Sequence, residues 1–225
     1  MCIPTTASSL TGTALASDSI PDCVPSDDLS QAAYKYASQL LHPAILNHSI
    51  RVFLYAKEVA VREASEWSKI DRLPLLFTAS IMHDVGTTDA HNGAQRFEVE
   101  GADAAVAVMR DSGTNASEQD MHDVWVAIAI HTSPGIAERI SPLARLVRIG
   151  VSVDFKRSPH LEGLSSVVQE TEGTFPRAEI EKVLGDAVVE QAMRQPAKAP
   201  AASWPGIMLR SAKENPGWTG VNQAF

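Results

Sequence analysis

Residues 73–88 read LPLLFTASIMHDVGTT, and this stretch carries the clearest structural pattern in the chain. Its apolar residues recur at the three- and four-residue spacing of an α-helix, and His83 lies on the same stripe. Pro74 falls in the first turn, where a missing backbone N–H is tolerated, and Gly86 is a typical terminator. We therefore predict a helix over 72–84 that ends on a histidine and an aspartate.

The same helical periodicity recurs along most of the chain, whereas strand-like alternation is scarce. Ser117 with Asp120 forms a helix-start signature, and Ser141 followed by Pro142 marks another start. The predicted helices cover residues 27–41, 44–64, 72–84, 97–111, 118–131, 142–154, 176–193 and 205–213. We therefore predict an all-α fold of about seven or eight helices.

The composition is that of an ordinary globular protein. Of the 225 residues, 20% are charged and 44% hydrophobic, with 13 Gly and 13 Pro, values that argue against collagenous or wholly disordered chains. A chain of this length can form one sizeable core, so we expect one folded domain over 26–225. Residues 1–25 begin with a stretch rich in Ser, Thr and Ala, and we predict that they form a flexible N-terminal arm.

The charge balance and the cysteine content exclude several kinds of partner and site. Subtracting 27 acidic from 19 basic side chains gives a formal net charge of −8, and no cluster of Lys or Arg is present. Such a chain would repel a phosphate backbone, so neither nucleic acid nor an anionic membrane is an expected partner. The two cysteines, Cys2 and Cys23, are too few for a thiolate metal site or a disulfide framework. Without a recognisable secretory signal or bilayer-spanning run, we expect a cytoplasmic protein.

Four side chains that bind metals well interrupt or end apolar helical stripes: His48, His83, Asp84 and Asp154. Burying an ionised carboxylate without a partner costs several kcal/mol or more, so the two aspartates need a cation, a cage of hydrogen bonds or exposure to solvent. One divalent ion would satisfy all four groups, and mixed nitrogen and oxygen ligands suit zinc, iron or manganese. The alternative for any single histidine is a hydrogen-bonded residue of the core.

The order His, then His-Asp, then Asp on successive helices resembles the HD superfamily of helical metalloenzymes, and within it the fungal cyanamide hydratases. The motifs that carry the resemblance are NHSIR at 47–51, HDVGTT at 83–88, RFEVEGA at 96–102, HT at 131–132 and KENP at 213–216. They spread over about residues 30–220, nearly the whole predicted domain. The resemblance implies an HD-type helical domain in which His48, His83, Asp84 and Asp154 bind zinc, with Fe²⁺ and Mn²⁺ as alternatives.

The resemblance also implies a reaction. The family adds water to the carbon–nitrogen triple bond of cyanamide, which gives urea, and we expect this hydro-lyase activity on cyanamide or on a related small neutral nitrile-like molecule. A bound zinc ion can lower the pKa of its water to about 7 and so supply hydroxide at neutral pH. The sequence departs from the family pattern in two places, because Phe155 follows the last aspartate where an Asn is usual and His91 matches no family role.

Hydration of a nitrile needs a group that accepts the water proton and a donor to the anion that develops on nitrogen. Asp84 or Glu98 is the candidate acceptor, and His131 is the candidate donor because imidazole transfers protons readily near neutral pH. The candidate substrate-binding residues are Thr87, Thr88 and Arg51. The structural alternatives are a hydrogen-bonded core histidine, an ion pair for the glutamate, turn caps for the threonines, and a supporting or surface residue for the arginine.

Two other function classes compete with the hydratase. A metal-dependent phosphohydrolase of the wider HD superfamily would act on a nucleotide or phosphate ester and would want Arg, Lys or a second metal near its anionic substrate. The basic candidates near the predicted site are Arg51, Lys57 and Arg96. The other class is a non-catalytic helical binding module with a closed structural metal site. The Trp and Pro content of the C-terminal third is compatible with a surface for a second copy of the chain, as in a homo-oligomer.

Overall fold

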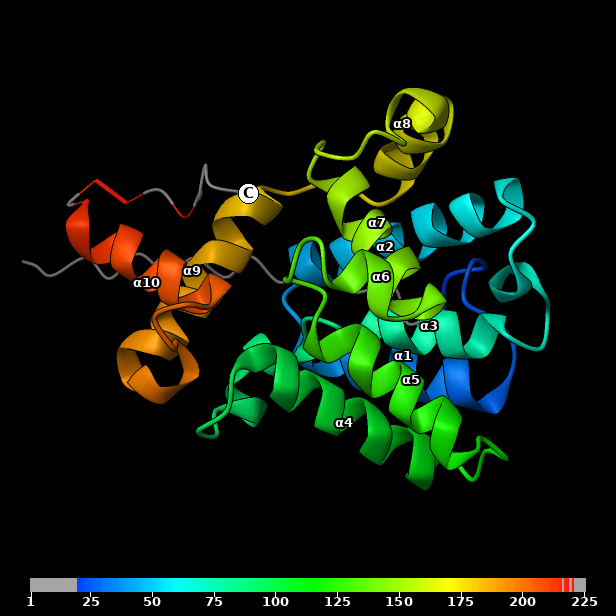
Figure 1. The fold of residues 1–225 in the computed structure, drawn as a ribbon, viewed down its shortest axis with the longest axis horizontal. Helices are drawn as coiled ribbons and strands as arrows, with labels where there is room; N and C mark the ends of the chain where they lie inside the picture. The colour runs from blue at the N-terminus through cyan, green and yellow to red at the C-terminus, as the bar shows by residue number, and fades with distance from the viewer. Residues whose placement is uncertain (1–19, 216, 219, 221–225) are drawn as a thin grey trace, which may run out of the picture.

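The computed structural model describes residues 20–215, 217, 218 and 220. Over these residues the chain forms ten α-helices and five short 3₁₀-helices and no β-strand (Figure 1), which confirms the all-α prediction. Residues 1–19 of the predicted N-terminal arm lie outside the described residues. Residues 20–25 form turns, and Val24 is buried in the hydrophobic core.

The α-helices are α1 (Asp28–Leu40), α2 (Pro43–Arg62), α3 (Leu73–Met82), α4 (Phe97–Asp111), α5 (Glu118–Ala129), α6 (Ala137–Ile140), α7 (Pro142–Asp154), α8 (Ser165–Thr174), α9 (Ile180–Arg194) and α10 (Trp204–Glu214). The 3₁₀-helices are η1 (Glu66–Ser68), η2 (Val85–Thr87), η3 (Asp89–His91), η4 (Glu162–Leu164) and η5 (Pro196–Lys198). Eight of the ten α-helices match predicted ones. The sequence did not predict α6, which is only four residues long, or α8, which buries only Val168 and Thr171.

Helix starts follow the local chemistry that the sequence indicated. Ser117 accepts a hydrogen bond from the backbone N–H of Asp120, and the Asp120 carboxylate accepts one from the backbone N–H of Ser117, which completes a capping box. Ser141 caps α7 in the same way through the N–H of Ala144, and Pro142 occupies the first turn. These caps satisfy backbone donors that would otherwise have no partner inside the helix.

Two predicted helix ends are wrong, and both differences place residues of the candidate site. The α-helix α3 ends at Met82 rather than 84, so His83 and Asp84 lie in the turn that leads into η2. The backbone of Gly86 packs directly on α4, where an added Cβ would stand 1.8 Å from the carbonyl oxygen of Phe97, and this contact turns the chain out of the helix. Helix α5 ends at Ala129 rather than 131, so His131 also lies in a turn.

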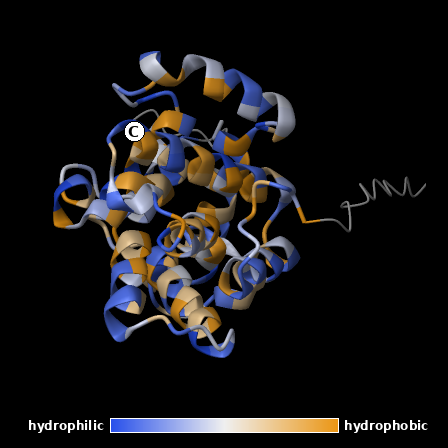
Figure 2. Cartoon of the chain, turned by 90° about the vertical axis from the view of Figure 1, so that its right-hand side faces the viewer, coloured by the Kyte–Doolittle hydropathy of each residue, from blue (hydrophilic) through white to orange (hydrophobic). Residues whose placement is uncertain are grey.

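Helix α2 is the central element of the fold. It packs against α7 and α3, and twelve of its 20 residues are buried, as expected for a helix surrounded by others. Helices α9 and α10 pair with one another and lie to one side, where α9 also contacts α2 and η2 (Figure 1). Most helices carry both hydrophobic and hydrophilic residues (Figure 2), as expected when one face of each helix is buried.

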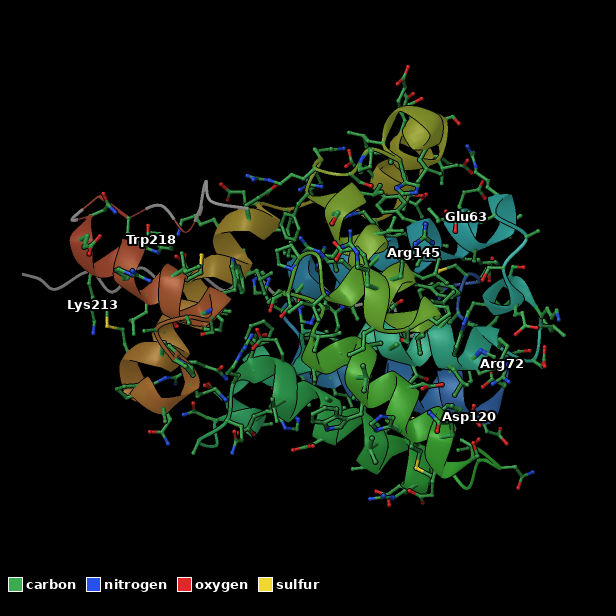
Figure 3. All side chains as sticks on the ribbon, in the orientation of Figure 1. Glu63, Arg72, Asp120, Arg145, Lys213 and Trp218 are labelled. Carbon is green, nitrogen blue, oxygen red and sulfur yellow. The ribbon has the colours of Figure 1, made fainter. Side chains whose placement is uncertain are left out.

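Ion pairs link neighbouring helices at the surface. Arg145 of α7 donates two hydrogen bonds to Glu63 beyond the end of α2, at 2.6 and 2.8 Å, and Arg72 donates one to Asp120 of α5 at 2.9 Å (Figure 3). The fold that these helices build has one extended hydrophobic core, which runs from Val24 to Met208 in sequence. None of the described helices combines enough length with enough apolar residues to cross a bilayer.

Candidate metal centre

Four side chains from three separate helical segments meet in the middle of the fold. His48 comes from the middle of α2, His83 and Asp84 follow the end of α3, and His131 follows the end of α5. All four are at most 3% exposed. The packing of α2 and α5 against α3 brings these distant stretches of sequence together, and the sequence alone does not specify this juxtaposition.

The imidazole Nε2 atoms of this cluster point towards the Asp84 carboxylate. Nε2 of His48 and Nε2 of His83 are 3.2 Å apart, and they lie 3.6 and 3.3 Å from Asp84 Oδ2. Nε2 of His131 lies 3.6 Å from the other carboxylate oxygen, Oδ1. The His83 ring contacts the His48 and His131 rings edge to face, with centroids 5.1 and 4.8 Å apart.

Hydrogen bonds at Nδ1 of His83 and His131 determine which ring nitrogen carries the proton and which has a lone pair available. Nδ1 of His83 lies 2.6 Å from the carbonyl oxygen of Ser80, and Nδ1 of His131 lies 2.7 Å from that of Ile128. A carbonyl oxygen only accepts hydrogen bonds, so both Nδ1 atoms carry the proton. In the neutral rings Nε2 therefore has a free lone pair, which is the form that binds a metal ion or accepts a proton.

The donor set fits a divalent cation. Neither buried oxygen of Asp84 accepts a hydrogen bond from any described residue, so an ionised carboxylate stands there without a donor. One ligand atom each from His48, His83 and Asp84 lies within 4.8 Å of the others. Zinc bonds of about 2.0–2.1 Å place tetrahedral ligand atoms roughly 3.3–3.4 Å apart, and the three distances between these atoms are 3.2, 3.3 and 3.6 Å.

The electrostatics of the cluster also call for a positive partner. Burial raises the pKa of Asp84, but the neighbouring His83 and His131 outweigh this effect and hold the pKa well below its ordinary value. Burial lowers the pKa of His83, yet the Asp84 carboxylate raises it above its usual value. The pKa of His48 is lowered, chiefly by burial. The anionic carboxylate is thus balanced either by a proton on His83 or by a metal ion bound at the same atoms.

Asp154, predicted as a fourth ligand, lies on the other side of the His48 ring. Its Oδ2 accepts a hydrogen bond from Nδ1 of His48 at 2.7 Å, while its two oxygens accept bonds from Arg51 at 2.6 and 2.8 Å. A buried aspartate needs a compensating positive charge, and the Arg51 guanidinium supplies it for Asp154. Burial raises the pKa of Asp154, but the hydrogen bonds from Arg51 and His48 bring it below its ordinary value.

Arg51 was predicted to bind substrate, but the structure commits its donors to protein groups. Its Nε and Nη2 donate to Asp154, and its Nη1 donates to the carbonyl oxygens of Phe175 and Pro176 at 3.0 and 3.2 Å. The side chain is fully buried. Arg51 therefore links α2, the end of α7 and the segment between α8 and α9, a role that agrees with its structural alternative.

None of the other predicted residues donates a hydrogen bond to the Asp84 carboxylate. The hydroxyl groups of Thr87 and Thr88 donate to the carbonyl oxygens of Asp84 and Val85, as expected for turn caps. Glu98 is buried and accepts hydrogen bonds from Thr132, at 2.7 Å, and from Arg96. This network adjoins His131 through Thr132, and it matches the ion pair considered for Glu98.

The structure adds neighbours that sequence patterns did not single out. Arg148 Nη1 donates to the carbonyl oxygen of His131 at 3.3 Å, and the Phe155 ring lies against the His48 ring with centroids 5.0 Å apart. Both residues border a hollow of about 280 Å³, together with Arg157 and two residues of α7. No histidine of the cluster lines this hollow, but its lining residues Arg148 and Phe155 contact His131 and His48. The one sequence feature that pointed to this hollow was Phe155, which stands where the family pattern usually has an Asn.

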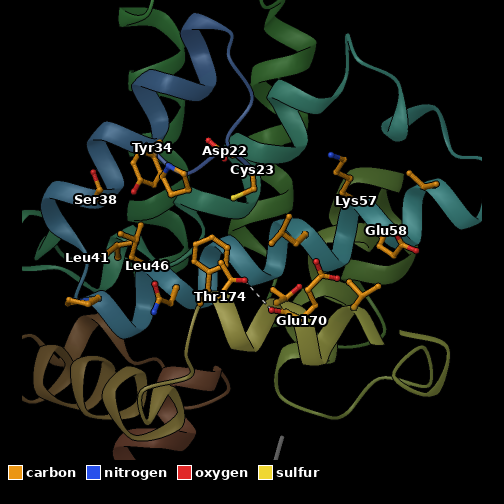
Figure 4. Close-up of a pocket in the computed structure, with 18 residues that line it drawn as sticks. Asp22, Cys23, Tyr34, Ser38, Leu41, Leu46, Lys57, Glu58, Glu170 and Thr174 are labelled. Atoms are coloured by element: carbon orange, nitrogen blue, oxygen red, sulfur yellow. Dashed lines mark hydrogen bonds between the residues drawn. The ribbon is translucent and has the colours of Figure 1, made fainter. Parts of the chain in front are cut away.

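A larger groove of about 900 Å³ lies between α1, α2 and α8 (Figure 4). It borders the face of α2 that carries Leu46, Leu54 and Lys57. None of the four clustered residues is among its lining residues. The groove is therefore separate from the candidate metal centre.

Comparison with known proteins agrees with this geometry. Residues 45–150 match the family model of the HD domain, a stretch that contains His48, His83, Asp84 and His131. Two proteins of Saccharomyces cerevisiae, Cyanamide hydratase DDI2 and Cyanamide hydratase DDI3, are each 26% identical to this chain over 160 residues, which cover 68% of this chain and 68% of each relative. The chain is therefore similar to the HD domain over residues 45–150, and the helical fold and the buried His-Asp cluster agree with this similarity.

Proposed function

We propose that this protein is a zinc-dependent hydratase that adds water to the carbon–nitrogen triple bond of cyanamide, or of a closely related small nitrile-like molecule, to give urea in the case of cyanamide. The observation that carries the proposal is the convergence of three imidazole Nε2 atoms on one buried carboxylate that lacks hydrogen-bond donors. The similarity to two proteins named cyanamide hydratase supports the substrate.

In this proposal His48, His83 and Asp84 would hold the ion, and a set of three protein ligands is typical of catalytic zinc sites. A bound zinc ion supplies Lewis acidity and lowers the pKa of water towards neutrality. The hydrogen bond between His48 Nδ1 and Asp154 fixes the ring so that Nε2 faces the Asp84 carboxylate, where it would be available to the ion. The carbonyl oxygen of Ser80 does the same for His83.

His131 then transfers the proton. Its Nδ1 proton is held by the carbonyl oxygen of Ile128, so Nε2 is the atom that accepts a proton from water. The water oxygen bonds to the nitrile carbon, one of the triple bond's electron pairs moves to nitrogen, and His131 returns the proton to that nitrogen. The resulting isourea tautomerises to urea, so one molecule of water is added and no oxidant or leaving group is involved.

The burial of the site favours a small neutral substrate. The cluster is at most 3% exposed, and the hollow of about 280 Å³ lined by its neighbours Arg148 and Phe155 has room for a molecule of a few heavy atoms. A small linear nitrile carries no charge that must be desolvated on entering such a site, whereas burying an unpaired ion is costly. The same burial excludes bulk water from the reacting atoms.

One observation favours the phosphohydrolase alternative. Arg148 and Arg157 both border the small hollow, and guanidinium groups bind phosphate oxygens well. Arg148 is held by Glu138, at 3.4 Å, and by the carbonyl oxygen of His131, while Arg157 is exposed. A panel of nucleotides and phosphate esters therefore accompanies cyanamide in the test below.

The test uses the purified full-length chain loaded with Zn²⁺, Fe²⁺ or Mn²⁺, with bound metal measured by elemental analysis. We expect zinc-dependent urea formation that a chelator abolishes. Asp84→Ala should lose both metal and activity, and the matched control His122→Ala, at an exposed position of α5, should keep both. A metal-loaded protein that makes no urea but turns over a phosphate ester would establish the alternative. Inactivity on both panels with tightly held metal would point to a binding module.

A further inference from the structure

We propose that Gln191 and Lys198 are positioning residues that hold the loop 85–91 next to Asp84 and so support the metal centre. They belong to helix α9 and the 3₁₀-helix η5, which lie beyond the stretch matched by the HD family model. The inference rests on the proposed function insofar as Asp84 binds a metal ion. It concerns residues to which neither the family match nor the sequence motifs assign a role.

Gln191 bridges α9 to this loop. Its side-chain Nε2 donates to the carbonyl oxygen of Gly86 at 3.0 Å and to that of Thr88 at 2.9 Å, so both amide protons are used. The side chain is 1% exposed. A single buried amide thus pairs two loop carbonyls that would otherwise lack these donors, and unpaired buried carbonyls are costly.

Lys198 holds the far end of the same loop. Its Nζ donates to the carbonyl oxygen of His91 at 2.7 Å and lies 3.8 Å from Oε1 of Glu100 on α4. The side chain is 2% exposed, and burial lowers its pKa while Glu100 opposes the shift. The His91 ring is in turn held 3.0 Å from the hydroxyl group of Tyr36 on α1.

The loop transmits this support to Asp84. The backbone N–H and the hydroxyl group of Thr87 both donate to the carbonyl oxygen of Asp84, at 2.9 and 2.7 Å. On the other side, Gly86 is pressed so closely against α4 that no Cβ fits. The loop is therefore clamped between α4 and the C-terminal helices, and it can shift only if the donors on α9 and η5 release it.

The choice of residue types indicates positioning rather than simple packing. Burying an apolar side chain in the core costs less free energy than burying an amine or amide, because a polar group must replace its lost hydration with hydrogen bonds. Both side chains direct their donors at backbone carbonyls of one short loop, whose first residue follows the carboxylate at the centre of the cluster. Groups that hydrogen-bond a metal ligand typically change metal affinity or activity 10–100-fold when removed, and Gln191 and Lys198 act on Asp84 through the backbone of the loop.

The experiment compares Gln191→Met, which keeps the approximate length and removes both donors, with the matched control Gln119→Met. Gln119 is exposed and donates only within its own helix, to Asp123. Hydrogen–deuterium exchange is measured on the zinc-loaded full-length protein, and the backbone amides of Thr87, Thr88 and His91 report directly because each is hydrogen-bonded inside the loop. Zinc affinity is measured by competition with a chelator.

For Gln191→Met we expect exchange in the loop to rise at least about tenfold while α5 and α7 keep their protection, and zinc affinity to fall roughly 10–100-fold. Lys198→Met should raise exchange chiefly at His91, and it serves as the second variant should the first not fold. Unchanged loop exchange and zinc affinity in both variants would overturn the inference, as would a uniform rise in exchange throughout the chain, which indicates a general loss of stability.

The two proposals can fail separately. If the wild-type protein binds zinc but forms no urea, the proposed reaction is wrong, whereas the exchange and affinity measurements still decide the role of Gln191 and Lys198. If urea forms and the variants also keep wild-type turnover, exchange and affinity, the hydratase stands and the positioning role is wrong. With cyanamide as substrate, we expect Gln191→Met to lower kcat while KM changes less than about twofold.

Discussion

Arg51 and Asp154 form a fully buried, two-point ion pair directly behind the first histidine of the cluster. Nε and Nη2 of the guanidinium donate to the two carboxylate oxygens at 2.6 and 2.8 Å, and the same carboxylate accepts the Nδ1 proton of His48. The aspartate thus orients an imidazole and is itself held by a guanidinium. This relationship separates two roles that a sequence pattern cannot separate, direct metal ligation and support of a ligand.

Asp154→Asn tests this separation. We expect zinc to bind at the wild-type stoichiometry when saturating, with affinity lowered roughly 10–100-fold, because His48 loses its anionic partner. The free energy of unfolding should fall by about 3–5 kcal/mol because Arg51 remains buried without its counter-charge. Chelator competition and guanidinium chloride denaturation measure the two effects. A folded Asp154→Asn protein that binds no zinc would instead make Asp154 a direct ligand, as the sequence predicted.

His131→Gln tests proton transfer. Removing a positioned acid–base group typically costs 10²–10⁴-fold in rate, so we expect kcat for cyanamide to fall by about that factor. Zinc content should not change, because His48, His83 and Asp84 suffice to hold the ion in our proposal. Steady-state kinetics with elemental analysis of the same samples distinguish the outcomes, with His122→Gln as the exposed control. Loss of zinc from His131→Gln would show that this histidine is a ligand.

Gly86→Ala tests the close approach between the loop and α4. The added Cβ would meet the carbonyl oxygen of Phe97 at 1.8 Å, so the backbone must move. Overpacking of this kind typically costs 1–3 kcal/mol, and we expect a loss of about 3 kcal/mol or more with weaker zinc binding. Gly173→Ala is the control, because its Cβ meets nothing within 4 Å on the exposed side of α8. It should raise stability by about 0.5–1 kcal/mol. Equal stability of the two variants would contradict the packing argument.

The ion pair between Glu63 and Arg145, away from the candidate metal centre, predicts how the stability of the fold depends on pH. Hydrogen bonds with Arg145 lower the pKa of Glu63 below the ordinary value of 4.5, so the folded state favours the ionised form (Figure 3). The pair therefore stabilises the fold at pH values above this ordinary pKa, and the stabilisation is lost as the pH falls through the lower pKa of the folded state.

We expect the stability difference between the wild type and Glu63→Gln to be constant near neutral pH and to shrink on acidification. Thermal unfolding between pH 3 and pH 7 measures this difference, on the order of a few degrees or less for a partly exposed pair. Glu66→Gln is the control, since Glu66 is largely exposed and lies 3.7 Å from Lys69. A difference that grows as the pH falls would contradict the predicted sign.

Much of the architecture was predictable from local sequence. Helical periodicity and capping residues predicted eight of the ten α-helices, because a helix that buries one face needs apolar residues at regular spacing and a partner for its first N–H groups. The short α6 and the polar α8 escaped this reasoning because neither has a clear apolar stripe. The helix ends at Met82 and Ala129 also escaped it; beyond Met82 the close contact of Gly86 with α4 is a tertiary one, which local sequence does not specify.

The candidate site, too, was predictable from the sequence only in part. Polar residues on apolar stripes revealed His48, His83 and Asp84, because a buried carboxylate must have a partner whatever the fold is. Which partner it has is a matter of geometry: Asp154 faces a guanidinium and a ring Nδ1, whereas Asp84 faces three ring Nε2 atoms. No spacing rule distinguishes these cases, because each aspartate comes at or just after the end of an apolar helical stripe.

The sequence by itself determined that the chain is helical, that it carries histidines and aspartates suited to a divalent cation, and that it resembles HD proteins. Only the tertiary structure decided which of these groups share one point in space, that Arg51 is a buried counter-ion, and that Gln191 and Lys198 reach back to the loop behind Asp84. The physical reason is that periodicity and capping act over a few residues, whereas a site depends on atoms within about 3–4 Å of each other from segments up to a hundred residues apart.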